Sequence, residues 1–223
     1  MVDFNEFIDK HLKRENRAKS IGRYYPSEIG GCIRKTWFSY RLPKETDKNT
    51  AKVFKAGEML HEFISEVIKS EKNPEIELVS SEIPVKIETK EFIISGRIDN
   101  LMLVKVDGKQ YLVEVKSCKF LPNEAKEDNV MQLQLYMHAI GIHDGIVLYI
   151  KKDDLQTKSF EFKYDKDMVK DILERFDVLH HTLTSQKIPD AEAKINVGKQ
   201  WMCGYCLWKE ECDIIDKENK EKI

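Results

Sequence analysis

The sequence predicts an α/β fold in which a central mixed β-sheet is flanked by helices. The period of the apolar residues changes from a helical repeat to strict alternation after residue 75, and later changes back. The resulting order is helices, three strands, a helix, two strands and a helix. The chain has 223 residues, 41% of them hydrophobic, and no internal repeat, so we expect one domain with one substantial core.

The N-terminal part is expected to be helical. Four apolar residues at helical spacing predict an amphipathic helix over residues 2–20, which Gly22 ends. A second helix is expected over residues 32–38 and a loop over residues 42–50. Residues 51–71 carry an apolar stripe that is long enough to predict a third helix.

The rest of the core is expected to alternate strands and helices. The pair Asp107-Gly108 is a strong hairpin signal between two of the strands. The expected strands cover residues 77–89, 92–104, 110–117, 145–151 and 158–164, and the expected helices cover residues 124–142 and 166–185.

Charge and composition exclude several classes of protein. The 37 Lys and Arg residues are offset by 39 Asp and Glu residues, so DNA binding would need a local patch or a metal. No apolar run approaches the roughly 20 residues that span a bilayer, and the N-terminus lacks the features of a secretory signal. We therefore expect a soluble, cytoplasmic protein without a membrane partner.

The expected hairpin brings three charged side chains together. A two-residue turn would place Asp99 directly opposite Lys116, and Glu114 lies two residues before Lys116 on the same face. The three side chains would therefore converge on one face of the sheet. A turn longer by one residue would destroy this arrangement, whereas a turn longer by two residues would keep it.

These charges have two interpretations. Two carboxylates and an ammonium among Ile98, Val113 and Val115 are costly if buried without a partner, and a divalent metal would remove that cost. Carboxylate oxygens suit Mg²⁺ or Mn²⁺, the Val115 carbonyl is a further candidate ligand, and Lys116 could orient or deprotonate a water. The alternative is a surface hairpin with solvated charges, because the pattern is short.

Three further residues are candidates for the same site. His61, on the helix expected over 51–71, could complete a metal site or be a structural histidine. Gln132 and Tyr136 are four residues apart on a later helix, so they project from one face. Both can hydrogen-bond a phosphate or steady Lys116, or they are ordinary polar residues of a helix surface.

Taken in order, these motifs resemble the RecB-like branch of the PD-(D/E)XK nuclease superfamily over most of the chain. The resemblance implies a restriction-endonuclease-like fold. Ile98 stands where the superfamily pattern has proline. The motifs are Gly57…His61, Gly96-Arg97-Ile98-Asp99, Glu114-Val115-Lys116 and Gln132-Leu133-Gln134-Leu135-Tyr136. The resemblance implies metal binding by His61, Asp99 and Glu114, catalysis by Lys116, and positioning of DNA or of the lysine by Gln132 and Tyr136.

Four of the five cysteines form a second pattern. Cys203, Cys206 and Cys212 lie in a tail with few apolar residues, and Cys32 lies far upstream. Such a set is a good thiolate cradle for structural Zn²⁺ or for an iron–sulfur cluster, which is a two-iron or a four-iron cluster. Zinc ligands usually come as two local pairs, so the iron–sulfur cluster is favoured. Cys118 is expected to be a small packed residue.

The cysteine arrangement is similar to that of the iron–sulfur nucleases of the CRISPR-associated Cas family four, the AddB subunit and the eukaryotic replication nuclease-helicase. In those families the cluster clamps the two ends of the nuclease domain, and four-iron is the expected type. We therefore expect a single domain over residues 1–223. Its parts are an N-terminal segment (1–50) with the first cluster ligand, a nuclease core (51–187) and a cluster-binding tail (188–223).

Basic and aromatic residues near the N-terminus are candidates for contacts with a DNA strand. Such a mixture suits single strands, because phosphates pair with cations and bases stack on rings; the alternative is a solvated helix face beside core aromatic residues. The candidates are Arg23, Tyr24, Arg34 and Lys35.

The resemblance implies a metal-dependent exonuclease acting on single-stranded DNA or DNA ends in CRISPR spacer acquisition, with CRISPR integration proteins as partners. The chain has no P-loop motif, so no helicase is expected. The alternatives are a repair, recombination or viral nuclease of the same superfamily, and a non-catalytic module that binds DNA ends.

Overall fold

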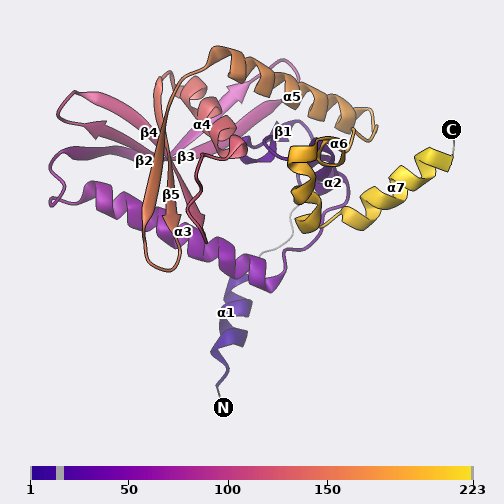
Figure 1. Ribbon diagram of the computed structural model, residues 1–223, viewed down its shortest axis with the longest axis horizontal. Coiled ribbons are helices and arrows are strands. Elements are labelled where there is room, and N and C mark those ends of the chain that lie inside the picture. The colour runs from indigo at the N-terminus through magenta and orange to yellow at the C-terminus, as the bar shows by residue number, and fades with distance from the viewer. Residues whose placement is uncertain (1, 14–17, 222–223) are drawn as a thin grey trace.

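The computed structural model describes residues 2–13 and 18–221, and the side chains only as far as residue 217. Figure 1 shows a twisted sheet with helices on both faces and the C-terminal tail beside it. The strands are β1 (Arg23–Tyr24), β2 (Ile76–Glu88), β3 (Ile93–Val104), β4 (Lys109–Cys118), β5 (Asp144–Lys151) and β6 (Thr157–Lys163). The helices are α1 (Phe4–Leu12), η1 (Pro26–Glu28), α2 (Ile33–Arg41), α3 (Lys48–Lys69), α4 (Glu127–Ile140), α5 (Lys166–Thr184), α6 (Glu192–Ile195), η2 (Val197–Tyr205) and α7 (Lys209–Glu221).

The sheet is mixed, as the sequence predicts. Its order is β1-β3-β4-β5-β6, and β2 pairs with β3. The pairs β1·β3 and β4·β5 are parallel, whereas β2·β3, β3·β4 and β5·β6 are antiparallel. Two strands share one edge of β3, because β1 pairs at residues 93–94 and β4 at residues 100–104. Within the described part of the chain, residues 95–99 of β3, which lie between them, have no strand partner on that edge.

Helices cover the two faces of the sheet and separate its apolar residues into clusters. On one face, Ile64 and Ile68 of α3 pack against Val113 and Val115 of β4. On the other face, Leu133 of α4 packs with Leu112 of β4 and Val147 of β5. A third cluster joins α2, α5 and part of α4. Alternation along β4 therefore leaves Glu114 and Lys116 on the same face as Leu112, which α4 covers.

Local sequence explains where the long helices begin and end. The carboxylate of Asp47 accepts hydrogen bonds from the backbone N–H groups of Asn49 and Thr50, which caps α3. Asp165 caps α5 in the same way. Gly141 ends α4 with a left-handed backbone, φ +72°, which glycine adopts without strain.

Several predicted boundaries differ from the structure. The helix expected over residues 2–20 is α1, which ends at Leu12; residues 14–17 of that range lie outside the described residues. The loop expected over residues 42–50 is shorter, since α3 already begins at Lys48 behind its Asp47 cap. In the described part of the chain, no helix is long and apolar enough to cross a membrane.

Candidate functional site

The predicted hairpin between β3 and β4 has a longer turn than expected. Val104 pairs with Lys109, so residues 105–108 form a four-residue turn and the two-residue turn is wrong. Leu101 therefore faces Leu112, not Glu114. Because the register differs by two residues, each side chain remains on the predicted face of the sheet.

Asp99 lies where β3 and β4 separate. The last paired residues are Asn100 and Val113, and beyond them the Asp99 side chain takes over the role of a strand partner. Its Oδ2 accepts a hydrogen bond of 2.7 Å from the backbone N–H of Val115. This contact fixes the carboxylate beside β4 through Oδ2, and Oδ1 is the oxygen near His61.

His61 approaches Asp99 from α3. Its Nδ1 is 3.4 Å from Asp99 Oδ1. Ser65, one turn further along α3, donates to the side-chain oxygen of the buried residue Asn100 at 2.6 Å. This second contact joins α3 to β3 next to Asp99, so it maintains the spacing between His61 and the carboxylate.

Glu114 and Lys116 belong to a chain of polar contacts that reaches α4. Lys116 Nζ donates to Glu114 Oε1 at 2.6 Å and to Gln132 Oε1 at 3.0 Å. The amide nitrogen of Gln132 donates in turn to the hydroxyl of Tyr136 at 3.1 Å. Gln132 therefore holds the ammonium with its oxygen and is itself held by Tyr136. The six candidates expected from sequence fall into two neighbouring groups: His61 with Asp99, and Glu114 with Lys116, Gln132 and Tyr136.

The electrostatics of this site favour a cation. Burial raises the pKa of Glu114 to about 7; Lys116 opposes this rise and Asp99 adds to it. Burial lowers the pKa of His61, but the hydrogen bond to Asp99 and the charges of Asp99 and Glu114 raise it overall. The pKa of Lys116 is also raised against burial, chiefly by Glu114. Both basic groups are therefore stabilised in their protonated, positively charged forms.

The donor set fits a divalent metal. Glu114 Oε2 is buried and has no hydrogen-bond partner among the described residues, which is costly for a carboxylate unless a cation binds it. Imidazole nitrogen and two carboxylates are ordinary ligands of Mn²⁺, and carboxylates alone suit Mg²⁺. As they stand, no three His, Cys, Asp or Glu side chains among the described residues have the geometry of a metal site.

The four cysteines of the predicted cluster line one cavity of about 30 Å³, which we call the cysteine cavity. Burial raises the pKa of the Cys203 thiol, and the nearby Cys32, Cys206 and Cys212 raise it further. Four sulfurs that line one small cavity are a suitable donor set for zinc or iron–sulfur. Cys118 is not part of this set. It packs against the apolar side chains between α4 and the sheet.

The tail is held by more than the cysteines. Trp208 is buried among α2 and α5, and its indole N–H donates to the carbonyl of Leu42 at 2.8 Å. Arg175 of α5 pairs with Glu192 of α6 at 2.8 Å. Trp208 and Arg175 therefore tether the tail to α2 and α5 in addition to the cysteines.

A groove of about 850 Å³ lies next to the polar contacts that link Lys116, Gln132 and Tyr136. Tyr136 connects the groove to these contacts, since it lines the groove and its hydroxyl accepts a hydrogen bond from Gln132. Gly96 allows this contact, because a Cβ there would lie 3.0 Å from the Tyr136 hydroxyl and 3.1 Å from Pro26. The groove is also lined by Arg23, Tyr25, Ser27, Pro84, Val85, Lys86, Ile93, Ser95 and Arg97.

The four residues expected to contact DNA lie in different environments. Arg23 lines the groove and donates to Ser95 at 3.1 Å. Tyr24 is fully buried, and its hydroxyl contacts His180, so its ring cannot stack on a base. Arg34 is also buried, and Lys35 borders the cysteine cavity. Tyr24 and Arg34 are therefore corrected to core residues.

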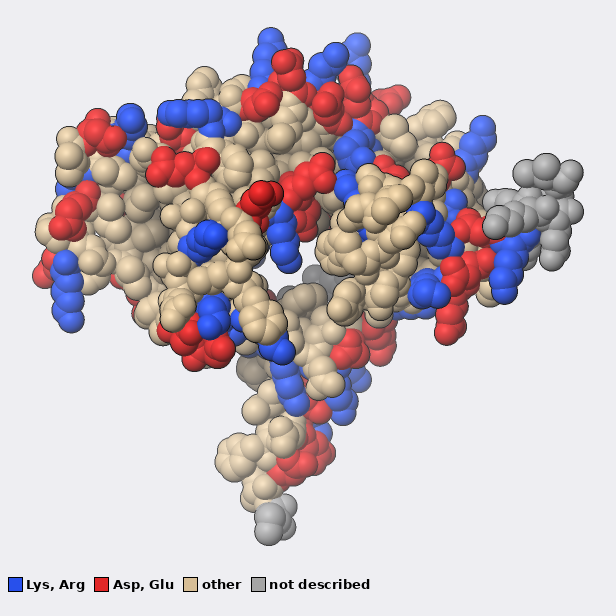
Figure 2. Space-filling model, viewed as in Figure 1, with Lys and Arg blue, Asp and Glu red and all other residues tan. Residues whose placement is uncertain are grey.

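The sequence interpretation missed most of the groove. Lys86 faces Ser95 and Pro84 faces Arg97 across β2 and β3, so these four residues share one face. Only the register of β2 on β3 brings Lys86 and Arg97 together, and no turn signal in the sequence sets that register. Figure 2 shows the molecule hollowed near its centre, with basic and acidic side chains around the opening.

This fold is that of a nuclease family. The family model for the PD-(D/E)XK nuclease superfamily matches residues 23–213. The chain therefore belongs to the PD-(D/E)XK nuclease superfamily, whose members act on nucleic acid with divalent metals. The fold class and the family expected from the sequence are both confirmed.

Its relatives include exonucleases. The CRISPR-associated exonuclease Cas4 of Saccharolobus solfataricus is 25% identical over 207 residues, which are 92% of this chain and 93% of that protein. The crystal structure of SSO0001 matches with a TM-score of 0.62 at 20% identity, over 93% of this chain and 94% of that one. LHK-Exo from Laribacter hongkongensis, in complex with dAMP, matches with a TM-score of 0.52 at 14% identity, over 75% and 90%. The two solved structures share the fold.

Proposed function

We propose that this nuclease is a divalent-metal-dependent DNA exonuclease that acts on single-stranded DNA or on DNA ends. The observation that carries the proposal is that His61 and Asp99 lie beside buried Glu114 and its partner Lys116. A module that only binds DNA does not need a carboxylate oxygen buried without a partner beside a fixed ammonium.

In this proposal His61, Asp99, Glu114 and the carbonyl of Val115 hold Mg²⁺ or Mn²⁺. The metal, when bound, polarises the scissile phosphate and lowers the pKa of the attacking water. The Val115 N–H already orients the Asp99 carboxylate, so the direction of this ligand is set before a metal binds.

Lys116 acts on the substrate as a cation. Because its pKa is raised, it remains protonated at neutral pH and donates hydrogen bonds to the phosphate or the attacking water. Gln132 and Tyr136 fix the direction of the ammonium from α4. A misplaced ammonium would stabilise the developing charge less well, so we assign positioning roles to both residues.

The groove beside Tyr136 is the proposed path of the DNA strand. Arg23, Lys86 and Arg97 can pair with phosphates, and the exposed ring of Tyr25 can stack on a base. Lys35 is retained as a further candidate for contact with DNA.

We propose a structural iron–sulfur cluster, four-iron rather than two-iron, bound by Cys32, Cys203, Cys206 and Cys212. The shared cavity supports this donor set, and one distant cysteine with a local trio is an unusual pattern for zinc. We also propose the division into an N-terminal segment (1–50), a nuclease core (51–187) and a cluster-binding tail (188–223).

The relative named as a CRISPR-associated exonuclease supports a role in spacer acquisition, with CRISPR integration proteins as partners. Shared length supports this context, since the match covers nearly all of both proteins.

The decisive test compares linear with circular single-stranded DNA. Anaerobically purified protein with Mn²⁺ should degrade end-labelled linear DNA and spare a circle, and EDTA should stop the reaction. The variant Lys116→Ala should bind the linear DNA without degrading it. Equal activity of Lys116→Ala and wild type would refute the enzymatic proposal, and cleavage of the circle would refute the exonuclease assignment.

A further inference from the structure

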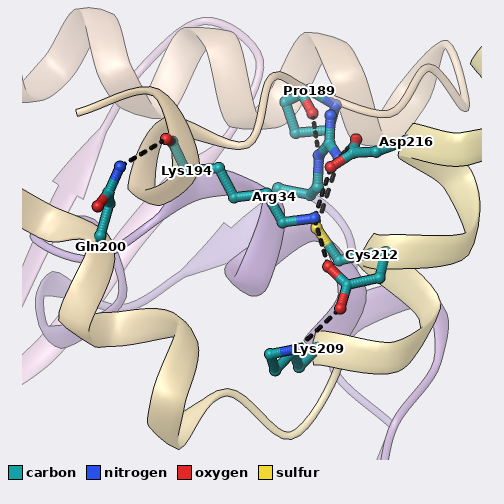
Figure 3. Close-up of polar contacts among 8 residues, drawn as sticks. Arg34, Pro189, Lys194, Gln200, Lys209, Cys212 and Asp216 are labelled. Atoms are coloured by element: carbon teal, nitrogen blue, oxygen red, sulfur yellow. Dashed lines mark hydrogen bonds and ion pairs between the residues drawn. The ribbon is translucent and has the colours of Figure 1, made fainter. Parts of the chain in front are cut away.

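A buried arginine contacts one of the four cysteines. Arg34 lies on α2, two residues after Cys32, and only 7% of its surface is exposed. Its Nη1 donates to Cys212 Sγ at 3.4 Å and to Asp216 Oδ1 at 2.6 Å. Its Nε donates to the carbonyl of Pro189 at 2.6 Å. Figure 3 shows the guanidinium between Pro189 and the Cys212–Asp216 side of α7.

Asp216 connects this arginine to a second cation. Its other oxygen, Oδ2, accepts from Lys194 Nζ at 2.5 Å, and Lys194 also donates to Asp213 at 2.7 Å. Lys194 borders the cysteine cavity together with Arg34. The network thus joins α2, α6 and α7, the elements that bring Cys32 and Cys212 to the same cavity (Figure 3).

We propose that Arg34 is a positioning residue for the iron–sulfur cluster, which holds the Cys212 thiolate by an N–H···S hydrogen bond and, balanced by Asp216, sets the reduction potential of the cluster. This inference rests on the cluster proposed above, and it concerns residues that are not cluster ligands.

The physical basis is charge. A cluster with four thiolate ligands is anionic, and reduction adds a further electron to it. A guanidinium that donates to a ligand sulfur stabilises the reduced form more than the oxidised form, so it raises the potential. Asp216 has the opposite effect, because its negative charge lies 2.6 Å from the guanidinium and it follows Cys212 by four residues, one turn of α7.

The geometry of Arg34 is fixed independently of the sulfur. Pro189 and Asp216 bind two different nitrogens of the planar guanidinium, so the direction of Nη1 toward Cys212 is constrained. A lysine at this position would keep the charge but could not make all three contacts. The substitution Arg34→Lys therefore separates charge from geometry.

The experiment measures the midpoint potential of the cluster in Arg34→Gln, Arg34→Lys and Asp216→Asn by anaerobic dithionite titration. Arg34→Gln should shift the potential to a more negative value, and Asp216→Asn should shift it to a more positive value. Arg34→Lys should retain most of the wild-type potential. With an iron chelator, Arg34→Gln and Arg34→Lys should both lose iron about tenfold faster than wild type, the usual scale for residues that orient metal ligands.

Arg175→Gln is the matched control. Arg175 is another partly buried arginine that ties α5 to α6 through Glu192, and its partners among the described residues are oxygens of Ile29, Gly31 and Glu192 rather than a sulfur. The substitution Arg175→Gln should loosen the same region without changing the midpoint potential of the cluster.

The outcomes separate the inference from its premise. Opposite shifts in Arg34→Gln and Asp216→Asn support the inference, because mere loosening would move both potentials in the same direction. Unchanged potentials, shifts of the same sign, or an equal shift in Arg175→Gln would overturn it while the cluster stands. A wild-type protein that is colourless and contains zinc instead of iron and sulfide would overturn the proposed cluster, and the inference with it.

Discussion

The carboxylate of Asp99 accepts a hydrogen bond from the backbone N–H of Val115 at 2.7 Å, at the point where β3 and β4 separate. The separation leaves an N–H of the buried residue Val115 without a strand partner, and the side chain supplies one. The same contact orients a metal ligand. Asp99 therefore has a structural and a proposed catalytic role, and the two roles can be separated by substitution.

Asp99→Asn should preserve the fold and abolish metal-dependent cleavage, because an amide oxygen can still accept from Val115 but the negative charge is lost. Asp99→Ala should also be less stable than Asp99→Asn by about 1–3 kcal/mol, the cost of a buried unpaired N–H. Urea unfolding followed by circular dichroism measures this difference. Equal stability of the two variants would show that Val115 N–H finds another partner.

Metal affinity should depend on pH through Glu114. Its pKa is raised to about 7, so a proton competes with the metal below that pH, whereas above it the carboxylate is free to bind. Affinity for Mn²⁺ should fall by about tenfold between pH 8 and pH 6 from Glu114 alone, and further if His61 is protonated. Calorimetry in two buffers of different ionisation heat should detect proton release at pH 6 and little at pH 8. Binding independent of pH over this range would contradict the proposed ligands.

Gln132→Ala should lower kcat on the order of tenfold, because it removes the oxygen that orients Lys116. Tyr136→Phe should have a smaller effect, since Gln132 still contacts Lys116 directly. Single-turnover cleavage at saturating Mn²⁺ measures both. Leu133→Met, a volume-conserving change on the buried face of the same helix, is the matched control for altered packing. The positioning role is wrong if Gln132→Ala cleaves at the wild-type rate.

Arg97→Ala should weaken binding of single-stranded DNA and reduce its salt dependence. One lost phosphate contact lowers the slope of log K against log salt by about 0.7. Fluorescence anisotropy with the Lys116→Ala protein as background measures binding without cleavage. Lys105 is an exposed cation directly after β3, and Lys105→Ala should leave the slope unchanged. An unaltered slope in Arg97→Ala would exclude that residue from the DNA path.

Trp208→Ala should destabilise the tail whether or not a cluster is bound. The indole is buried and its N–H is paired with Leu42, so truncation should cost about 3–5 kcal/mol. Limited proteolysis of the chelator-treated protein, with and without the substitution, measures this. If treated wild type is cleaved in the tail as fast as Trp208→Ala, the cysteines alone hold the tail.

Much of the fold follows from sequence because its signals are local. The alternation in β4 and the stripe in α3 set which face each residue occupies, and this placed Glu114 and Lys116 beside each other. The prediction of a two-residue turn at Asp107-Gly108 is wrong because this pair here completes a four-residue turn. Asp107 accepts a hydrogen bond from the Lys109 N–H, and Gly108 has a left-handed backbone. Each side chain still lies on its predicted face, because the register differs from the prediction by two residues and not by one.

Contacts between residues far apart in the sequence are harder to predict from the sequence. The groove requires the register of β2 on β3, which juxtaposes Lys86 and Ser95 without any local signal. Composition likewise cannot distinguish an exposed ring from a core ring, and Tyr24 is fully buried although basic residues surround it in sequence. Conversely, the sequence groups the four cysteines because their chemistry restricts the possibilities more than apolar packing does, and in the structure all four line the cysteine cavity.

Titration of Mn²⁺ into the anaerobic protein at pH 8, followed by electron paramagnetic resonance, tests the proposed catalytic metal centre most directly. Wild type should bind Mn²⁺ tightly, and Glu114→Gln should lose that binding, whereas Glu77→Gln, which neutralises an exposed carboxylate of β2, should retain it. Tight binding that persists in Glu114→Gln would contradict the account.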